Sequence, residues 1–406
     1  MNLLKRRLNP YAFLFGALFL PLIQVNLYTG LVPKWFCAVE LVLILLLYIW
    51  QQRMPSSITW FLLLFVAIMV YSTYHTGKPL AYAIYYSVQL AAFLLLMDLF
   101  FQIDPMMVLN TIQYLMGLLI LLNLFFQLVK PDYFGVSPTS GNYYNLLVSD
   151  NELPYYMVPY MLVVAVNSFA HHGRLTLWNF AIITLAYGSV VVSWTATGVV
   201  GGAVAYLSIV TVALLKYPRF HKRLFFWLVL LYIVVFVSIV VFRVQEWFPY
   251  LVEKILKKDL TFSGRTGIWD EAFRIIRQHL WLGQGTIAGG RLTVIPFDIT
   301  SGTLVSAHSY FLEITMQAGL LGVSCFVAVW FLIGKRFTAY HTTSNRILLV
   351  ASLCFFAMLV LYTTEGWLYH TFQYTIYYLL FACAAPVYCV VPIPNQAVTN
   401  FNQIRR

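Results

Sequence analysis

Apolar stretches of about 20 residues follow one another from end to end of this chain, and they leave few folds open to it. A helix needs ~20 mostly apolar residues to cross ~30 Å of hydrocarbon. Charged residues make up only 10% of the 406, and 61% are hydrophobic, whereas a soluble domain carries about a quarter charged residues. The mean hydropathy is +0.79. We therefore exclude a water-soluble globule and expect an all-α, polytopic integral membrane protein.

The apolar runs predict about twelve transmembrane helices. The first six lie near residues 11–28, 35–50, 58–74, 80–100, 107–129 and 153–170, and the others near 175–193, 198–215, 224–243, 307–333, 345–364 and 368–390. We expect residues 1–243 to hold spans one to nine with an outer loop at 130–152, residues 244–306 to form a large outer loop, residues 307–390 to hold the last three spans, and residues 391–406 to form a tail.

Basic residues indicate how these spans are oriented. The net charge is +11, which in a soluble protein would suggest nucleic acid, but here the positive-inside rule accounts for it. If the N-terminus is inside, fourteen basic residues fall in inner segments: Lys5, Arg6, Arg7, Arg53, Arg174, Lys216, Arg219, Lys222, Arg223, Lys335, Arg336, Arg346, Arg405 and Arg406. The short outer loops hold three, Lys34, Lys78 and Lys130. Both termini are therefore expected in the cytoplasm.

Cysteine usage gives no sign of a disulfide frame or a metal site. The five cysteines are Cys37, Cys325, Cys354, Cys383 and Cys389, all in apolar stretches and without paired spacing. Cysteine in such surroundings behaves as a small buried hydrophobe.

The large outer loop is where we expect the chemistry, because loops this long in a compact fold are usually functional. Residues 247–258 predict an interfacial amphipathic helix. A second amphipathic helix is predicted from Ser263 onwards, with Ile268, Ala272, Ile276 and Leu280 on one face. Arg265 stands at its N-terminal end, where the helix dipole and an Arg fork both favour a phosphate.

The rest of the loop, through Gly283, Gly285 and Pro296, has the composition of turns rather than of a strand or helix. It ends at His308, at the outer mouth of the tenth span, and Glu313 follows about one and a half turns deeper. An ionisable residue inside a span is a functional candidate by default.

The ordered motifs of this loop resemble a known signature. Ser-Gly-Arg-x-x-Ile-Trp at 263–269, Gly-x-Gly at 283–285 and Ala-His-Ser-Tyr at 307–310 with a following Gly-Leu-Leu-Gly resemble the large loop of the O-antigen polymerase and O-antigen ligase superfamily. The resemblance implies a membrane glycosyltransferase of the GT-C type, working at the periplasmic face of the bacterial inner membrane. It also implies a donor and an acceptor carried on undecaprenyl pyrophosphate, with no metal or other cofactor, and a chain-length regulator as a candidate partner.

By the same resemblance, Arg265 matches the family arginine that engages the pyrophosphate, and His308 matches the histidine near the transfer site. A guanidinium aimed at the leaving diphosphate stabilises the transition state more than the ground state, and a His suits proton removal from an acceptor hydroxyl. Glu313 is a third catalytic candidate, and Glu365 and His370 are weaker ones. The substrate-binding candidates are Arg274, Arg291, Ser263, Gly264, Trp269 and Tyr310.

Three alternatives stay open at this point. The ligase branch usually carries a second arginine near the outer start of a span, but residues 193–198 contain no basic residue, which favours the polymerase. A flippase of lipid-linked sugars would predict short outer loops and repeat symmetry. A metal-dependent transferase could use Asp150 and Glu152 as paired carboxylates.

Overall fold

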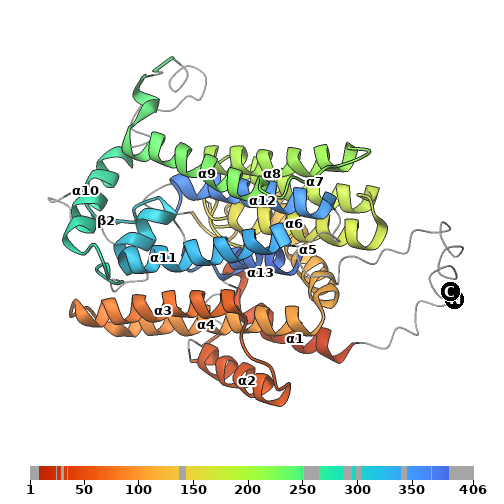
Figure 1. Cartoon of the computed structure of the whole chain (residues 1–406), viewed down its shortest axis with the longest axis horizontal. Coiled ribbons are helices and arrows are strands. Elements are labelled where there is room, and N and C mark those ends of the chain that lie inside the picture. Colours follow the sequence, from red (N-terminus) through yellow and green to blue (C-terminus); the bar gives the residue numbers. More distant parts are fainter. Residues whose placement is uncertain are drawn as a thin grey trace, which may run out of the picture.

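The chain forms a bundle of long helices with a small cap of loop elements at one end (Figure 1). The computed structural model describes residues 9–23, 25–28, 32–33, 35–136, 143–247, 249–250, 265–286, 295–298, 303–339, 345–366 and 368–383. Each of the twelve apolar ranges predicted from the sequence contains a helix within these residues. Their bounds are α1 (Pro10–Leu22), α2 (Phe36–Trp50), α3 (Ser57–His75), α4 (Leu80–Ile103), α5 (Pro105–Val129), α6 (Pro154–His172), α7 (Leu177–Ser193), α8 (Ala196–Leu214), α9 (Leu224–Phe236), α11 (Tyr310–Ala339), α12 (Asn345–Thr364) and α13 (Thr375–Cys383).

Seven helices in the described part of the chain are long and apolar enough to cross a membrane, which supports an integral membrane protein. They are α3, α4, α5, α8, α9 with its π-helical extension to Val241, α11 and α12. Three shorter helices, α1, α2 and α7, are also apolar. Cys37, Cys325, Cys354 and Cys383 are buried, in line with their expected packing role; Cys389 lies outside the described residues.

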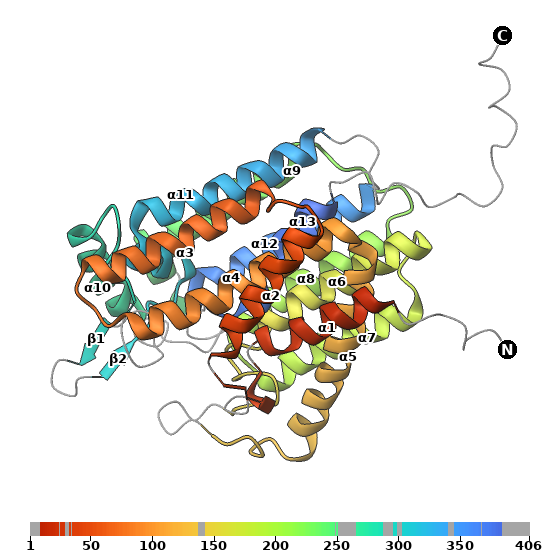
Figure 2. The same ribbon diagram turned by 90° about the horizontal axis from the view of Figure 1, so that it is seen from below.

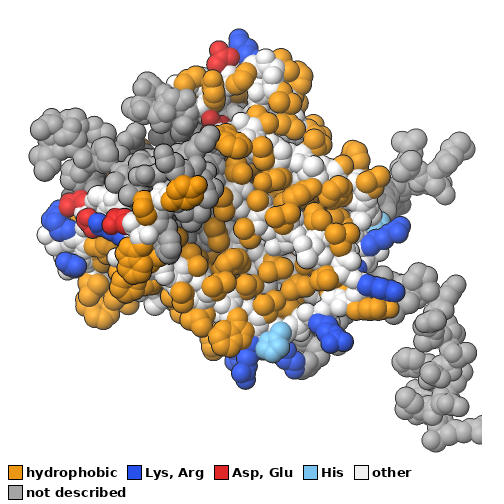
Figure 3. All heavy atoms as spheres, turned by 90° about the horizontal axis from the view of Figure 1, so that it is seen from above, with side chains coloured by type: hydrophobic (Ala, Val, Ile, Leu, Met, Phe, Trp, Pro, Cys, Tyr) orange, Lys and Arg blue, Asp and Glu red, His pale blue; other side chains and the backbone are white. Residues whose placement is uncertain are grey.

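Helix α6 forms the centre of the bundle. Every residue from Pro154 to Phe169 is buried, and the helix packs against α5, α7, α8 and α12. Around it, α3 and α4 form one layer, α7, α8 and α9 form another, and α11 runs beside α3 between them (Figures 1 and 2). Figure 3 shows hydrophobic side chains across the middle of one face, with basic side chains towards its right-hand and lower margins and both basic and acidic ones at its left-hand margin and top.

Contacts between loops show which helix ends lie together. At one end, Arg53 donates to the carbonyl of Gln102, and Arg346 donates to the carbonyls of Gly173 and Leu215. We call this the inner end. At the opposite, outer end, the amide of Asn26 donates to the carbonyl of Leu147, and the Thr76 hydroxyl donates to the carbonyl of Gln284. The grouping matches the alternation of inner and outer segments predicted from charge.

The loop between α9 and α11 supplies the cap at the outer end. It contains helix α10 (Arg265–Gln278), as predicted, with Ile268, Ala272 and Ile276 buried. Leu280 falls beyond the helix and is 40% exposed, so its predicted place on the buried face is wrong. Most of the helix predicted at 247–258 lies outside the described residues.

The prediction of turns around Pro296 is also wrong. Strands β1 (Ile295–Asp298) and β2 (Thr303–Val305) form an antiparallel hairpin, with Ile295 opposite Val305. Proline is tolerated there because a two-stranded hairpin has only edge strands, where a missing N–H need not break a ladder. Turn composition alone therefore did not reveal this hairpin.

Gly319 breaks α11, and the end of the cap repairs the break. Its φ of +62° interrupts the helix, which leaves backbone groups on both sides without helical partners. The amides of Gln284 and Gly285 donate to the carbonyls of Met316 and Gln317, and the amides of Leu320 and Leu321 donate to the carbonyls of Leu280 and Trp281. The segment 280–285 is thus inserted into the backbone hydrogen bonding of α11.

We expect Gly319→Ala to destabilise the outer end of the bundle. A Cβ at this position would lie 2.2 Å from the carbonyl oxygen of Trp281, in a left-handed backbone conformation that penalises L side chains. The thermal midpoint of the detergent-solubilised protein should fall by several degrees. Gly188→Ala in α7 is the matched control, because nothing lies within 4 Å of its Cβ position. An unchanged midpoint for Gly319→Ala would contradict this explanation.

Candidate active site

Arg265 is the first residue of α10, at the position predicted from its motif. Its guanidinium Nη2 lies 2.5 Å from the Oε1 atom of Glu365, which follows the last residue of α12. The side chain of Arg265 is 18% exposed and that of Glu365 is 7% exposed. The helix start therefore places a cation at the outer end, where a buried carboxylate 100 positions away in the chain meets it.

His308, in the turn before α11, contacts the same carboxylate. Its Nδ1 atom lies 3.5 Å from Oε2 of Glu365, and its side chain is 25% exposed. Glu365 therefore lies between the two residues that the loop motifs singled out. With Nδ1 facing the carboxylate, Nε2 is the ring nitrogen left for a proton acceptor role.

The backbone around His308 is held in an unusual conformation. His308 has a φ of +46°, a region that non-glycine residues rarely adopt. The preceding residue is fixed on both sides: a Glu313 carboxylate oxygen accepts from the amide of Ala307 at 2.5 Å, and the Trp269 indole donates to its carbonyl at 3.1 Å. Glu313 and Trp269 thus fix the turn that orients His308. In the described contacts, both side chains bind the backbone of Ala307.

The electrostatics of Glu365 follow from its two neighbours. Burial by itself would raise the pKa of this carboxyl, but the Arg265 guanidinium and His308 outweigh it, so the pKa of Glu365 is lowered. The carboxylate is charged at neutral pH and balances the charge of Arg265. Removing either partner should destabilise the fold, because an unpaired charge left in a buried site is strongly destabilising.

The segment after α12 fits closely against the His308 turn. A Cβ on Gly366 would lie 2.7 Å from Cγ of Glu313 and 3.0 Å from the backbone of Ser309. From α6, the Tyr155 hydroxyl donates to the backbone carbonyl of Glu365 at 3.1 Å. Glycine at 366 and tyrosine at 155 therefore fix where Glu365 lies. Its place at the outer end of an apolar span is the sequence signal that made Glu365 a weaker candidate.

A second acid–histidine contact lies on the next few residues. His370 Nε2 is 3.6 Å from Oε1 of Glu152, and its Nδ1 is 3.5 Å from the Tyr156 hydroxyl. Burial would raise the pKa of Glu152, but His370 and the Ser149 hydrogen bonds outweigh it, and the pKa is lowered. This contact ties the outer loop 143–153 to the segment that carries Glu365.

The structure places the other candidates away from the Arg265–Glu365–His308 contact or outside its described residues. Tyr310 is fully buried, stacks on Tyr362 with ring centroids 4.0 Å apart, and donates to the hydroxyl of Tyr374 at 3.2 Å. Arg274 is exposed and forms two hydrogen bonds to Glu271. Ser263, Gly264 and Arg291 lie outside the described residues.

The paired carboxylates considered for a metal are engaged by the outer loop itself. Asp150 accepts hydrogen bonds from the amide of Tyr143 at 3.0 Å and from the side chain of Asn145 at 2.8 Å. Glu152 accepts from the amide of Ser149 at 3.0 Å. These oxygens stabilise the turn before α6, and the described residues contain no cluster of three or more metal-ligating side chains.

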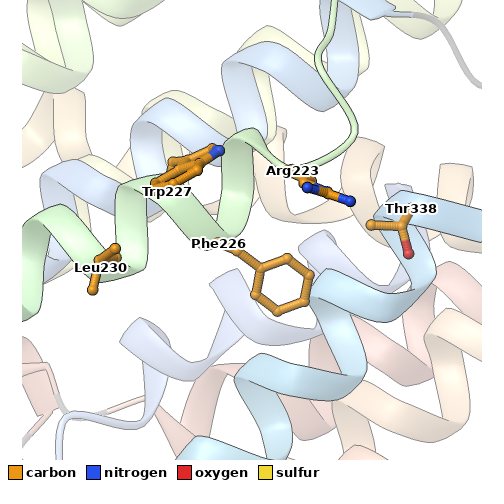
Figure 4. A pocket seen from close by; sticks show the side chains of 5 residues that line it. All are labelled: Arg223, Phe226, Trp227, Leu230 and Thr338. Atoms are coloured by element: carbon orange, nitrogen blue, oxygen red, sulfur yellow. The ribbon is translucent and has the colours of Figure 1, made fainter.

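A groove apart from these residues lies at the inner end. It has a volume of about 290 Å³ and is lined by Arg223, Phe226, Trp227 and Leu230 at the start of α9 and by Thr338 of α11 (Figure 4). Phe226 turns towards α11, where it lies over Gly334. The groove shares no residue with the site at the outer end.

Comparison with known proteins gives one match. Residues 180–327 match the family model described as O-antigen ligase. The matched segment runs from α7 into α11 and contains both Arg265 and His308. No curated protein and no solved structure matches the chain. The family match confirms the resemblance indicated by the loop motifs and supports a glycosyltransferase-like activity of the polymerase and ligase type.

Proposed function

We propose that this chain, of which residues 180–327 match the O-antigen ligase family model, is a polysaccharide polymerase of the O-antigen polymerase and ligase superfamily. It transfers a growing glycan from undecaprenyl pyrophosphate onto the next lipid-linked repeat unit. All twelve apolar helices span the bacterial inner membrane in a GT-C-type arrangement, both termini are cytoplasmic, and the outer end faces the periplasm. A chain-length regulator is a further candidate partner.

The contact of Arg265 and His308 with one carboxylate carries this proposal. Two short motifs, 43 positions apart, meet at the outer end, where a lipid-borne diphosphate would lie at headgroup level. At rest, Glu365 neutralises Arg265. A diphosphate is a competing anion for the same guanidinium, and its arrival leaves Glu365 to hold His308.

The proposed reaction is a direct displacement. The acceptor hydroxyl oxygen forms a bond to the anomeric carbon of the donor sugar while the bond from that carbon to the diphosphate oxygen breaks. The electron pair passes to the diphosphate, where Arg265 stabilises the developing charge. The hydroxyl proton passes to His308 Nε2, and the Glu365 carboxylate steadies the imidazolium that forms. One-step displacement inverts the anomeric configuration.

A ligase that transfers the glycan to lipid A core is the second candidate, because the matching family model bears that description. The turn between α7 and α8 favours the polymerase. It contains no basic residue from 193 to 198. Gly198 packs closely on Pro154 at the start of α6, next to Tyr155, which donates a hydrogen bond to the carbonyl of Glu365. A second arginine of the ligase type is missing there.

Complementation separates the two functions. We expect the gene to restore the ladder of long polysaccharide in a strain that lacks its polymerase, and to leave a ligase-deficient strain without glycan on its core. The reverse pattern would identify a ligase, and rescue of neither strain would contradict both assignments. Transfer by the purified protein should also survive EDTA, because the proposed chemistry uses Arg265 where other transferases use a divalent cation.

A further inference from the structure

The outer end holds two buried hydrogen-bond donors without acceptors among the described residues, in addition to the pair formed by Arg265 and Glu365. The Nζ atom of Lys78, in the turn between α3 and α4, is buried, as is the side-chain amide nitrogen of Gln284. Neither has a hydrogen-bond partner in the part of the chain that the structure describes, and Gln284 is only 9% exposed. Buried donors are costly unless an acceptor is supplied, so this pair calls for one from outside the protein.

The segments that carry the two donors are hydrogen-bonded to the same end of α3. The Thr76 hydroxyl donates to the carbonyl of Gln284 at 2.9 Å, and the amide of Lys78 donates to the carbonyl of Thr73 at 3.1 Å. The amide of Thr286 donates to the Thr73 hydroxyl at 2.9 Å. Lys78 and Gln284 therefore emerge from adjoining turns that the end of α3 holds together.

The charge around Lys78 favours an anion. Burial lowers the pKa of Lys78 to about 8, and no carboxylate contributes to that shift. Thr73, Thr76, Gln284 and Thr286, which form the contact, are uncharged, and the nearest titratable side chain along α3 is exposed His75. The start of α4 at Leu80 adds the partial positive charge of a helix N-terminus. At neutral pH the turn is a cation that lacks a counter-ion among the described residues.

Its depth in the membrane fits a lipid phosphate. Tyr71 and Tyr74, on the last turn of α3, are 53% and 68% exposed, and exposed aromatic residues of this kind mark the headgroup level. Arg265 is the first residue of α10 and pairs with Glu365, whereas the 283–286 turn follows the other end of α10 and pairs with the backbone of α11 at Met316 and Gln317. The two cations therefore belong to different elements of the outer end, which α3, α10 and the hairpin share (Figure 2).

We infer that Lys78 and Gln284 bind the phosphate oxyanion of a second lipid-linked glycan, the acceptor, while Arg265 binds that of the donor. The inference rests on the proposed polymerase function. A polymerase joins two lipid-linked glycans, so the acceptor hydroxyl at His308 is separated from the acceptor's own diphosphate by one oligosaccharide repeat. Two oxyanion sites, one at the start of α10 and one at the turn that follows its other end, suit a reaction that joins two lipid-linked glycans.

Binding of inorganic pyrophosphate tests the site directly. The full chain is placed in phosphatidylcholine nanodiscs, and its affinity for inorganic pyrophosphate is measured. Lys78→Gln should weaken the binding of pyrophosphate at this site about tenfold, as expected for loss of a charged hydrogen-bond donor. Lys78→Arg should retain it, and so should Lys130→Gln, which removes an outer-loop lysine elsewhere. In the wild type this binding should fall above about pH 8 as the ammonium loses its proton, whereas Lys78→Arg should hold its affinity to pH 9. Equal binding by wild type and Lys78→Gln would overturn the site.

Transfer kinetics test which lipid occupies it. With distinguishable donor and acceptor glycans, Lys78→Gln should raise the KM for the acceptor about tenfold and leave the donor KM and kcat near wild type. If the acceptor KM stays unchanged while phosphatidylglycerol in the nanodisc displaces pyrophosphate from the Lys78 site, the occupant is a bilayer phospholipid and the acceptor assignment fails. If the wild type transfers no glycan, the proposed function fails, and the pyrophosphate titration still decides whether the oxyanion site exists.

Discussion

Replacing Arg265 with Ala should reduce glycan transfer at least a hundredfold while the protein remains in the membrane. The guanidinium is the charged group at the outer end that meets the site carboxylate, and loss of one preorganised charge-stabilising donor typically costs about 10²–10³ in rate. The measurement is polysaccharide length on gels together with transfer by purified protein. Long-chain polysaccharide retained at the wild-type level would refute the role assigned to Arg265.

Two further variants keep this test free of folding effects. Arg265→Ala leaves Glu365 as a buried charge without its partner, which by itself can cost about 3–5 kcal/mol of stability. The double variant Arg265→Ala/Glu365→Gln removes that charge, so it should regain thermal stability and remain inactive. Arg274→Ala is the matched control on the same helix: its pair with Glu271 is exposed, and we expect activity within about twofold of wild type, as for most surface substitutions.

His308→Asn should abolish most transfer without disturbing the fold. Asparagine tolerates the left-handed backbone that His308 adopts, so this variant removes the imidazole and keeps the turn. Loss of a general base typically lowers the rate about 10²–10⁴-fold. The change should appear in kcat, with the melting temperature unchanged. His279→Asn, at an exposed position just past α10, is the control; equal activity of both variants would exclude His308 from proton transfer.

Glu365→Gln distinguishes a base from the group that positions it. If Glu365 acts through His308, the glutamine variant should retain part of the activity, because the amide oxygen can still accept from Nδ1. A loss as complete as that of His308→Asn would instead make Glu365 the proton acceptor. The 3.5 Å separation from His308 allows the positioning role that we propose.

The local part of this protein could be predicted from its sequence, because the signals involved are local. Hydropathy located a helix in each of the twelve apolar ranges, seven of which are long and apolar enough to cross a membrane, and the 3.6-residue period located α10 with Arg265 at its start. Those patterns depend only on which residues occupy one helix. They failed at β1 and β2, where a proline in an edge strand looks the same as a proline in a turn.

The tertiary structure decided what the candidate residues touch. Nothing local in the sequence indicates that Glu365 lies between Arg265 and His308. The same holds for the hydrogen bonds of Trp269 and Glu313 to the backbone of Ala307. It also holds for the burial of Tyr310 inside the bundle. These contacts join segments up to 100 positions apart. They depend on how helices cross and on where backbones approach, as at Gly319 and Gly366, and such packing is a property of the assembled bundle rather than of any one stretch of chain.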